Sequence, residues 1–524
     1  MTSAHLGCGK ALALTRRLSP GADMLSLYAA LSANGTRADT LLIETLVGPS
    51  LILDRAALRI ECRGPAASAT ALTRSGALVL RAIERSLAPY LESSAPDRLS
   101  FRFPAPGGLD AEARLLAPSP FDALRAIVTG LTSMSREEPF TLACPGIVAF
   151  DHVDLFEQLP PAEADPLGFP DFVFWLAESL IVMEPGVAPR LVCTAFGSDD
   201  PVEAERSHFS AAERLAALAA RCEAASPLPD LPRVAAAPAQ AELSDLDDGE
   251  YCAVVSELKG RIREGDVYQI VPSRTFRAPC ADPLSSFAAV RRLDPSPYMF
   301  FVSAGDHLLF GASPETAVRV SRQEGWPTVE VKPIAGTRPR GATPDEDDRM
   351  EADLRLDQKE IAEHMMLVDL ARNDVARICI PGSRRVDRLM SVERYARVMH
   401  LVSSVRGSLA IGFDALHALQ ACLNVGTLSG APKLKAMELL RLTEKTKRGP
   451  YGGAVGWING EGMMDTGVII RSAVVKDGTA HVRAGAGVVH DSDPQREADE
   501  TRRKASAILS ALAQTLVREE ETAA

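Results

Sequence analysis

Cysteine is sparse in this chain, and no two cysteines have the spacing of a metal site. The nine cysteines are scattered over 524 residues without a Cys-x-x-Cys pair, which favours buried, reduced thiols over a zinc site or a disulfide framework. Aromatic residues make up 5% of the sequence, and no basic, aromatic-rich segment is present. Together with a net charge of −12, this argues against a protein that binds nucleic acid or anionic membranes.

Long hydrophobic runs are also lacking. The most apolar segment, Phe172–Met183, contains Glu178 and is well short of the roughly 20 apolar residues that a membrane span needs. The start of the chain has no apolar core of the kind found in secretory signals. No Walker lysine motif and no dinucleotide-binding glycine fingerprint occur. We therefore expect a cytoplasmic protein without a membrane anchor.

What is present is enough chain for two or three domains, or for one very large one. The stretch 224–238 is rich in proline and alanine and has no periodic apolar residues, which is typical of a linker. It predicts an N-terminal region at 1–240 and a C-terminal region at 241–524.

Apolar periodicity predicts an α+β fold with large antiparallel sheets rather than alternating βαβ units. The expected strands include 267–271, 298–303, 454–458, 464–475 and 479–486. The expected helices include 207–222, 251–263, 357–376, 433–442 and 499–519. The proline- and acid-rich segment 341–348 is expected to be an exposed loop.

Two short stretches each place two glutamates three residues apart. On a helix, Glu497, Glu500 and Lys504 share one face. Glu360 and Glu363 have the same spacing in the second stretch. One such pair is a common solvated surface feature, but two pairs in one domain suggest an acidic centre that a cation must neutralise. Mg²⁺ suits such a centre because it takes few protein carboxylates and completes its shell with substrate oxygens.

Further segments of the C-terminal region carry more glycine and polar residues than a packed core needs. They are 333–341, 399–403, 426–433, 451–456 and 469–473. The segment 426–433 also opens a predicted helix whose free N–H groups suit an anion. Taken singly, His400 would more often be a packed histidine and Arg471 a structural ion pair.

In their order along the chain, these segments resemble the chorismate-utilising enzymes, and among them the large subunits of anthranilate synthases. The resemblance includes Gln-Ile-Val-Pro-Ser at 269–273, Gly-Ala-Ser-Pro-Glu at 311–315 and Leu-Val-Asp-Leu-Ala-Arg-Asn-Asp at 367–374. It runs from about residue 41 to about residue 512. It implies large antiparallel β-sheets packed as a sandwich with flanking helices, and an enzyme that uses chorismate with Mg²⁺ as cofactor.

The resemblance also implies a role for each matching residue. Glu315 would be the general acid that protonates the departing C4 hydroxyl, and His400 would act in pyruvate elimination. Mg²⁺ would be held by Glu363 and Glu500, with Glu360 and Glu497 in the adjoining shell. The substrate would be contacted by Gly336, Thr337, Thr427, Tyr451, Arg471, Gly485, Gly487 and Lys504.

Two positions separate this chain from other members of the family on chemical grounds. Aminodeoxychorismate synthases carry a nucleophilic lysine where this chain has Ala335, and isochorismate synthases carry a basic lysine where it has Gln269. Both differences favour ammonia as the nucleophile at C2, followed by pyruvate loss to anthranilate. The alternatives are an enzyme that stops at 2-amino-2-deoxyisochorismate, another chorismate-utilising enzyme, or a binding protein that has lost catalysis. His400 argues against the first, and the intact charged residues argue against the last.

The ammonia is expected to come from another chain, because no Gly-x-Cys-x-Gly nucleophile elbow surrounds any of the cysteines. The resemblance implies a separate glutamine amidotransferase subunit. We therefore expect a hetero-oligomer in which that subunit supplies ammonia.

Tryptophan is the feedback inhibitor that the resemblance implies, bound mainly by the N-terminal region. The matching residues are Glu44, Thr45, Pro295, Pro297, Tyr298 and Met299. The family's serine is replaced by Thr45, and its asparagine by Asp294. Because threonine adds a methyl group and aspartate adds a charge while losing an amide donor, we expect weakened inhibition by tryptophan.

Overall fold

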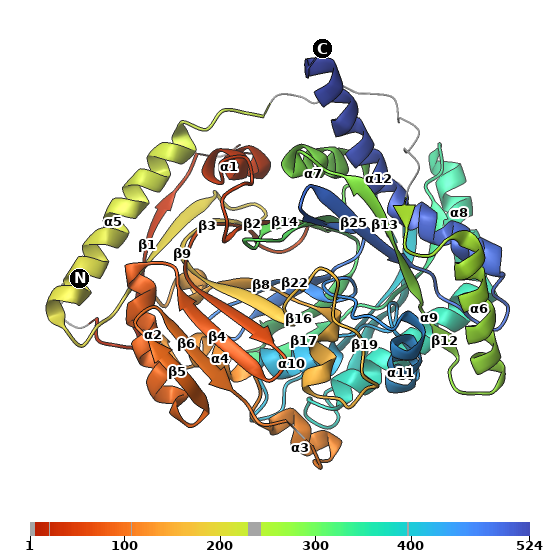
Figure 1. Cartoon of the computed structure of the whole chain (residues 1–524), viewed down its shortest axis with the longest axis horizontal. Coiled ribbons are helices and arrows are strands. Elements are labelled where there is room, and N and C mark those ends of the chain that lie inside the picture. The colour runs from red at the N-terminus through yellow and green to blue at the C-terminus, as the bar shows by residue number, and fades with distance from the viewer. Residues whose placement is uncertain are drawn as a thin grey trace.

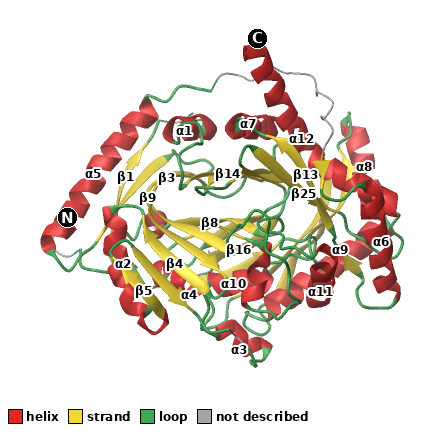
Figure 2. Cartoon of the chain, in the orientation of Figure 1, coloured by secondary structure: helices red, strands yellow, loops and turns green. Residues whose placement is uncertain are grey.

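The computed structural model describes residues 6–19, 21, 23–105, 107–228, 243–395 and 398–523, with side chains as far as residue 516. The predicted linker lies outside these residues from position 229 onward. Strands occupy the middle of the molecule and helices surround them (Figures 1 and 2). Within the described part of the chain, no helix is both long enough and apolar enough to cross a membrane.

The strands, in chain order, are β1 Lys10–Arg17, β2 Thr40–Thr45, β3 Ser50–Arg63, β4 Ala66–Ala71, β5 Leu91–Ala95, β6 Arg98–Arg102, β7 Thr132–Ser133, β8 Cys144–Val148, β9 Phe172–Met183, β10 Arg190–Phe196, β11 Leu243–Ser244, β12 Gln269–Ile270, β13 Ser273–Pro279, β14 Tyr298–Ser303, β15 Leu308–Ser313, β16 Thr316–Gln323, β17 Trp326–Val331, β18 Ile334–Pro339, β19 Arg385–Arg394, β20 Val398–Ser408, β21 Gly430–Ala431, β22 Ala454–Ile458, β23 Met464–Val468, β24 Ser472–Lys476 and β25 Thr479–Gly485.

The helices are α1 Met24–Leu31, α2 Arg74–Ser86, α3 Ala111–Leu116, α4 Phe121–Val128, α5 Pro201–Glu223, α6 Asp248–Arg263, α7 Pro283–Leu293, α8 Pro344–Leu356, α9 Gln358–Ala376, α10 Ala415–Cys422, α11 Lys433–Glu444 and α12 Pro494–Ala523. Short 3₁₀ turns lie at Ala88–Tyr90, Pro139–Leu142 and Phe150–Leu155.

Two antiparallel layers diverge from the long pair formed by β3 and β9. The first layer runs from β3 through β2, β14, β15, β24 and β25 to β13. The second runs from β9 through β8, β22, β23, β16 and β17 to β20, which also pairs with β18 and β19. Figure 1 shows β2, β3 and β14 above β8, β16 and β22. The predicted α+β fold, with large antiparallel sheets packed as a sandwich and flanking helices, is confirmed.

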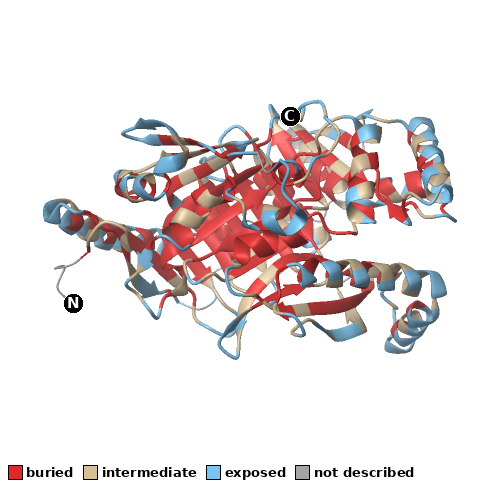
Figure 3. Cartoon of the chain, turned by 90° about the horizontal axis from the view of Figure 1, so that it is seen from below, coloured by how far each residue is buried: buried red, intermediate tan, exposed pale blue. Residues whose placement is uncertain are grey.

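The strand β14 shows why several strands read as continuous apolar runs. Phe300 and Val302 point into the cluster between the two layers, whereas Met299 and Phe301 point outward into a cluster that includes Tyr28 of α1. Because both faces of the strand are covered, neither face needs polar side chains. Figure 3 shows that the strands in the middle of the molecule are largely buried, whereas exposed residues lie on the rim.

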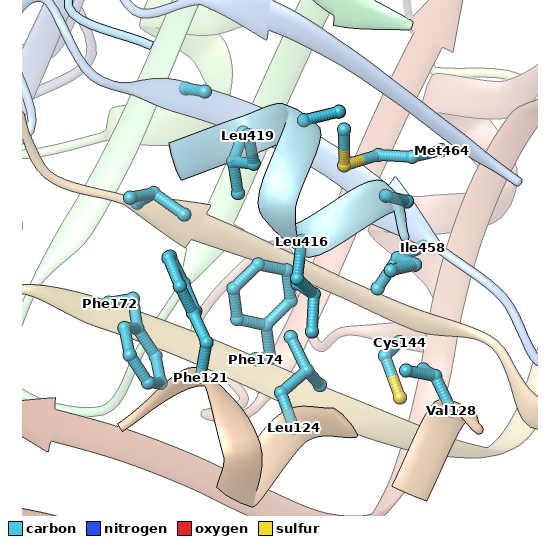
Figure 4. Packing of buried hydrophobic residues seen from close by; sticks show 14 of the residues in the cluster. Phe121, Leu124, Val128, Cys144, Phe172, Phe174, Leu416, Leu419, Ile458 and Met464 are labelled. Atoms are coloured by element: carbon cyan, nitrogen blue, oxygen red, sulfur yellow. The ribbon is translucent and has the colours of Figure 1, made fainter. Parts of the chain in front are cut away.

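The outer face of the second layer is covered by short helices from both halves of the chain. Figure 4 shows this packing among Phe121 and Leu124 of α4, Phe172 and Phe174 of β9, and Leu416 and Leu419 of α10. The rings of Phe121 and Phe172 are stacked with their centroids 5.0 Å apart. Burial of each such side chain contributes about 1.5–3 kcal/mol.

The two halves of the chain share both layers. In the first layer β2 pairs with β14, which places Glu44 opposite Met299 and Thr45 opposite Tyr298. In the second layer β8 pairs with β22 over residues 144–148. Residues near 44 and 298, far apart in sequence, are therefore neighbours.

A two-stranded ribbon passes from one layer to the other and carries two of the predicted site residues. It is formed by β15 with β24 in the first layer and continues as β16 with β23 in the second. Glu315 lies at the bend between β15 and β16, and Arg471 at the bend between β23 and β24. The bends are linked by backbone hydrogen bonds from Val468 N–H to Glu315 (3.0 Å) and from Ala312 N–H to Arg471 (3.1 Å).

Three local predictions were wrong in detail. The single strand expected at 464–475 is two strands, because Arg471 has φ +46° and turns the chain. Segment 341–348 is mostly exposed, as expected, but it is not a loop: the Thr343 hydroxyl accepts from Glu346 N–H, and Pro344 begins α8. Within it, Asp347 is buried against Arg340, 2.7 Å away. The strand expected at 267–271 is limited to Gln269–Ile270.

Candidate active site

Glu315 is a buried carboxyl at the bend between the two layers. It is 5% exposed, and its Oε1 accepts a hydrogen bond from the Thr427 hydroxyl at 2.8 Å. Burial raises the pKa of Glu315 to about 7, against the lowering effects of the Thr427 hydrogen bond and the Lys504 charge. Half of such carboxyls are protonated near neutral pH, which suits a general acid.

His400 lies in β20 directly opposite Thr337 of β18. Its Nδ1 is 3.0 Å from the Thr337 hydroxyl and 3.2 Å from the Gly336 carbonyl oxygen. Burial lowers the pKa of His400 to about 4, so the ring is neutral at physiological pH. Because the carbonyl can only accept, we assign the ring proton to Nδ1. Nε2 then keeps its lone pair, and it is buried without a hydrogen-bond partner among the described residues.

The irregular backbone of β18 opposite His400, called here the Gly336–Thr337 turn, needs a glycine at position 336. Gly336 has φ +72°, and a Cβ there would lie 2.9 Å from Leu354 Cδ1 and 3.3 Å from Glu360 Oε2. Its backbone therefore approaches the carboxylate of Glu360 more closely than another residue type would permit. This contact joins the Gly336–Thr337 turn to helix α9.

Helices α9 and α12 bring the two predicted pairs of glutamates together. Burial raises the pKa of Glu363, and the charges of Glu360 and Glu497 raise it further. Burial likewise raises the pKa values of Glu360 and Glu497, and the charge of Glu500 adds to both. Glu500 is the exception: burial acts to raise its pKa, but the charge and hydrogen bond of Lys504, with the charges of Arg503 and Lys359, lower it on balance. The four carboxylates thus repel one another across the space between the helices.

Two lysines partly neutralise this acidic cluster. Lys504 Nζ is 2.8 Å from Glu500, and Lys359 Nζ is 3.6 Å from Glu363. Among the described residues, no three histidine, cysteine, aspartate or glutamate side chains form a ready cation site. The cluster nevertheless fits Mg²⁺ in its donor chemistry, because that ion needs only one or two protein carboxylates when a substrate supplies further oxygens. Glu363 and Glu500, one from each helix, are the residues that would hold it.

The glycine-rich turn after β25 lies against Lys504, Tyr451 and Gln269. Lys504 Nζ donates to the Gly485 carbonyl at 3.0 Å. A Cβ on Gly485 would lie 3.0 Å from the Tyr451 hydroxyl, and one on Gly487 would lie 3.5 Å from Gln269 Nε2. Gly485 and Ala486 are buried, so Gly487, which is partly exposed beside Gln269, is the position of this turn that a ligand could approach.

Arg471, like Lys504, is a predicted substrate residue that already has a charged partner. Its Nη1 donates to Asp294 Oδ2 at 3.1 Å. Asp294 was predicted to alter the tryptophan pocket, but its carboxylate faces Arg471. The charge of Arg471 also lowers the pKa of His400, in addition to burial, so the guanidinium lies near the imidazole.

The predicted regulatory residues border a separate cavity of about 670 Å³. Glu44, Thr45, Pro295 and Met299 line it, with Arg291 donating to Glu44 at 2.7 Å. Pro297 and Tyr298 are not among its lining residues. Tyr298 points the other way and donates to Asp465 at 2.6 Å, because successive residues of β14 face opposite sides.

Several residues near the site were not predicted from the sequence. Lys332 lines a small cavity with Glu315 and Thr427. The Tyr395 ring lies 5.6 Å from the His400 ring, and its hydroxyl donates to Glu393 at 2.7 Å. The position of Lys332 directly before the 333–341 segment could have drawn attention to it. Tyr395 lies outside every segment that was singled out.

Comparison with known proteins supplies independent information. The sequence matches the family described as "chorismate binding enzyme" over residues 108–510. It is 44% identical over 506 residues to anthranilate synthase component 1 of Vibrio cholerae, covering 94% of each chain. It is 45% identical over 465 residues to the pyocyanine-specific anthranilate synthase component 1 of Pseudomonas aeruginosa, covering 87% of this chain and 85% of the relative. The crystal structure of anthranilate synthase component I from Streptococcus pneumoniae superposes with a TM-score of 0.70 at 29% identity, covering 89% of this chain and 93% of that one.

Proposed function

The chain belongs to the chorismate-binding enzymes, and on that premise we propose that it is the large subunit of an anthranilate synthase, which converts chorismate and ammonia into anthranilate and pyruvate. The main support is Glu315, a buried carboxyl with a pKa of about 7, which shares a site with an acidic cluster and Arg471. This combination suits a substrate with two carboxylates and a hydroxyl that must leave.

Substrate binding is assigned to the two ends of the site. Glu363 and Glu500 would hold Mg²⁺, which would neutralise the acidic cluster and supply positive charge for the ring carboxylate of chorismate. Lys504 and the Gly336–Thr337 turn assist at the same end. Arg471 and Tyr451 hold the enolpyruvyl carboxylate at the other end, where a guanidinium can orient a carboxylate through paired N–H donors.

The first step replaces the C4 hydroxyl by an amine at C2. Ammonia attacks C2, both ring double bonds shift by one position, and the C4–O bond breaks. Glu315 donates its proton to the departing hydroxyl, which leaves as water. The new C2 ammonium then loses one proton, which restores the acid form of Glu315 or passes to solvent. Gln269, which is buried near Gly487, cannot remove a proton from water and is placed instead as a polar neighbour of the incoming ammonia.

The second step removes pyruvate. A base takes the proton from C2, the C3–O bond breaks, and the ring becomes aromatic. The enolpyruvate that leaves takes up a proton at its methylene carbon and is released as pyruvate. We assign the base to Nε2 of His400, since this nitrogen carries a lone pair and has no partner among the described residues. Glu360 lies beside the Gly336 turn and positions it.

His400→Asn is expected to separate the two steps. Amination does not use the imidazole, whereas removal of the C2 proton does, so chorismate should still be consumed while an aminated intermediate accumulates. Mass spectrometry of the products, with anthranilate fluorescence recorded in parallel, measures this outcome. Tyr395→Phe is the matched control, because it keeps the ring beside His400 and should still yield anthranilate. Undiminished anthranilate formation by His400→Asn would exclude this assignment.

Thr427→Val is expected to move the pH dependence of the first step. Glu315 must be protonated to act, so kcat/KM should fall as pH rises through about 7. The Thr427 hydrogen bond stabilises the carboxylate, so its loss raises the Glu315 pKa. The fall of kcat/KM at alkaline pH should therefore move to higher pH by about one unit, the size expected for one charge-assisted hydrogen bond. Rates are compared at a fixed concentration of free NH₃. Thr427→Ser keeps the hydroxyl and should leave the pH at which kcat/KM falls unchanged. If that pH is unchanged in Thr427→Val as well, the assignment of Glu315 is contradicted.

The ammonia source is assigned to a glutamine amidotransferase subunit, so the working protein is a cytoplasmic hetero-oligomer. Free ammonium at alkaline pH should replace that subunit, at lower efficiency. The proposed function is tested with the purified chain, chorismate, Mg²⁺ and excess ammonium. Anthranilate that disappears with EDTA supports it, and a hydroxylated product or no turnover would refute it.

The similarity to a pyocyanine-specific relative leaves both tryptophan synthesis and a secondary pathway as destinations for the product.

Tryptophan is assigned to the cavity lined by Glu44 and Met299. Arg291 is already paired there with Glu44 at 2.7 Å and with Asp23 at 2.9 Å. An amino acid ligand must compete with these pairs, so we expect no inhibition at low micromolar tryptophan. A titration of anthranilate formation with tryptophan measures this, and inhibition in that range would contradict the expectation. The same titration of Glu44→Ala is the control: inhibition that is unchanged in this variant would mean that tryptophan acts at another site.

A further inference from the structure

The ion pair between Asp294 and Arg471 joins two parts of the chain that are remote in sequence. Asp294 follows α7 directly, and Arg471 occupies the bend of the ribbon between β23 and β24. Both side chains are mostly buried, at 19% and 24% exposed. Among the residues that the structure describes, Asp294 is the sole side chain bonded to the guanidinium of Arg471. The substrate residue Arg471 thus depends on a single neighbour for its orientation.

The backbone of Arg471 makes such a neighbour necessary. Its φ of +46° interrupts the strand, so the side chain does not gain the fixed direction that a regular β-strand would impose. An arginine side chain has many rotamers and loses much freedom when it is held in place. One charge-assisted hydrogen bond at Nη1 removes part of this freedom before a substrate arrives.

The Arg471 guanidinium has more hydrogen-bond donors than its contact with Asp294 uses. Arginine has five N–H donors in a planar fork. Asp294 accepts from Nη1, and the other donors remain for a ligand. The charges of Arg471 and Asp294 both act on His400, with opposite signs, so the pair lies at the edge of the reaction site.

The backbone of Asp294 is held independently of its side chain. Its N–H donates to Val290 at 2.8 Å and closes α7. Replacement of the carboxylate therefore leaves the end of the helix intact. This makes Asp294 suitable for substitution without loss of the fold.

We infer that Asp294 is a positioning residue for chorismate binding: it holds the Arg471 guanidinium in the orientation that receives the enolpyruvyl carboxylate. This inference rests on the proposed function of Arg471. It assigns to Asp294 a role in the catalytic half of the protein, and not in the wall of the tryptophan cavity.

The test compares Asp294→Ala with Asp294→Asn in the full chain. Asp294→Ala should raise the KM for chorismate about tenfold, the effect of roughly one charge-assisted hydrogen bond. The kcat should change much less, because the chemistry does not involve Asp294. Asp294→Asn retains an oxygen that accepts from Arg471 and should restore most of the KM. Calorimetric titration of chorismate in the absence of ammonia should reproduce both changes as Kd values.

A double mutant separates this inference from the proposed function. If Asp294 acts through Arg471, Asp294→Ala should cause no further loss when it is added to Arg471→Ala. Additive losses, an unchanged KM in Asp294→Ala, or a KM in Asp294→Asn below that of the unaltered protein would overturn the inference. The last result would mean that the carboxylate competes with chorismate for Arg471. If Arg471→Ala itself leaves the KM unchanged, the role proposed for Arg471 fails instead.

Discussion

Glu315→Gln is expected to lower kcat/KM for anthranilate formation by about 10²–10⁴-fold, the usual contribution of a general acid. Glutamine has nearly the same shape, and its amide can still accept from the Thr427 hydroxyl, now 2.8 Å from the Glu315 carboxylate. It cannot deliver a proton to the departing hydroxyl. The loss should therefore appear in kcat, while the Kd for chorismate changes little. Steady-state kinetics and calorimetric titration together distinguish the two quantities.

The control for Glu315→Gln concerns the fold. Removal of a buried ionisable group relieves the desolvation that raises its pKa, so the thermal midpoint should be equal to that of the unaltered protein or higher. Inactivity accompanied by a large fall in thermal midpoint would reflect unfolding and not lost acid catalysis. A variant that keeps its fold and more than a tenth of its kcat would show that another group donates the proton.

Glu500→Gln is expected to abolish the response to Mg²⁺ and to lower kcat/KM by about 10²–10³-fold, because a metal stabilises developing charge by several kcal/mol. The side chain keeps its size but loses the negative charge that, together with Glu363, would hold the ion. The measurement is the Mg²⁺ concentration required for half-maximal anthranilate formation, with chorismate saturating. EDTA should inhibit the unaltered protein and leave the residual activity of the variant unchanged.

Two variants on the same helix isolate the effect of Glu500. Asp499 is exposed and adjacent in sequence, so Asp499→Asn changes the net charge equally and should leave the Mg²⁺ response unaltered. Lys504 is paired with Glu500 at 2.8 Å, so Glu500→Gln also frees this lysine. Lys504→Met should weaken chorismate binding while the Mg²⁺ requirement remains. An unchanged Mg²⁺ response in Glu500→Gln would place the metal elsewhere.

Glu315 and His400 were predicted as site residues from motifs that resemble those of the chorismate-utilising enzymes, and the acidic cluster was predicted from the spacing of its glutamates. Helical spacing was sufficient to place Glu360 beside Glu363 and Glu497 beside Glu500, since residues three apart share a face. Large antiparallel sheets could be predicted from apolar runs such as 298–303, which are covered on both faces, whereas the sandwich was implied by the resemblance to the family.

Contacts made across the fold could not be predicted in the same way. The pairing of Asp294 with Arg471 depends on how the end of α7 meets the bend of the ribbon, 177 positions later in the chain. The side chain of Tyr298 lies within the motif expected to bind tryptophan, yet the alternation of β14 directs it toward Asp465. Backbone features such as the positive φ of Arg471 also cannot be recognised in the sequence, because arginine has no preference for that conformation.

The pairing of β2 with β14 and of β8 with β22 limits how the gene for this protein can be divided. A shortened chain that begins after the proline-rich stretch would contain every proposed catalytic residue. It would nonetheless expose the hydrogen-bonding edges of β14 and β22, which are apolar and normally covered. Unpaired edges of this kind promote aggregation. Removal of the first 240 residues is thus a poor way to test whether the protein is regulated, and substitutions within the cavity lined by Glu44 and Met299 are the better one.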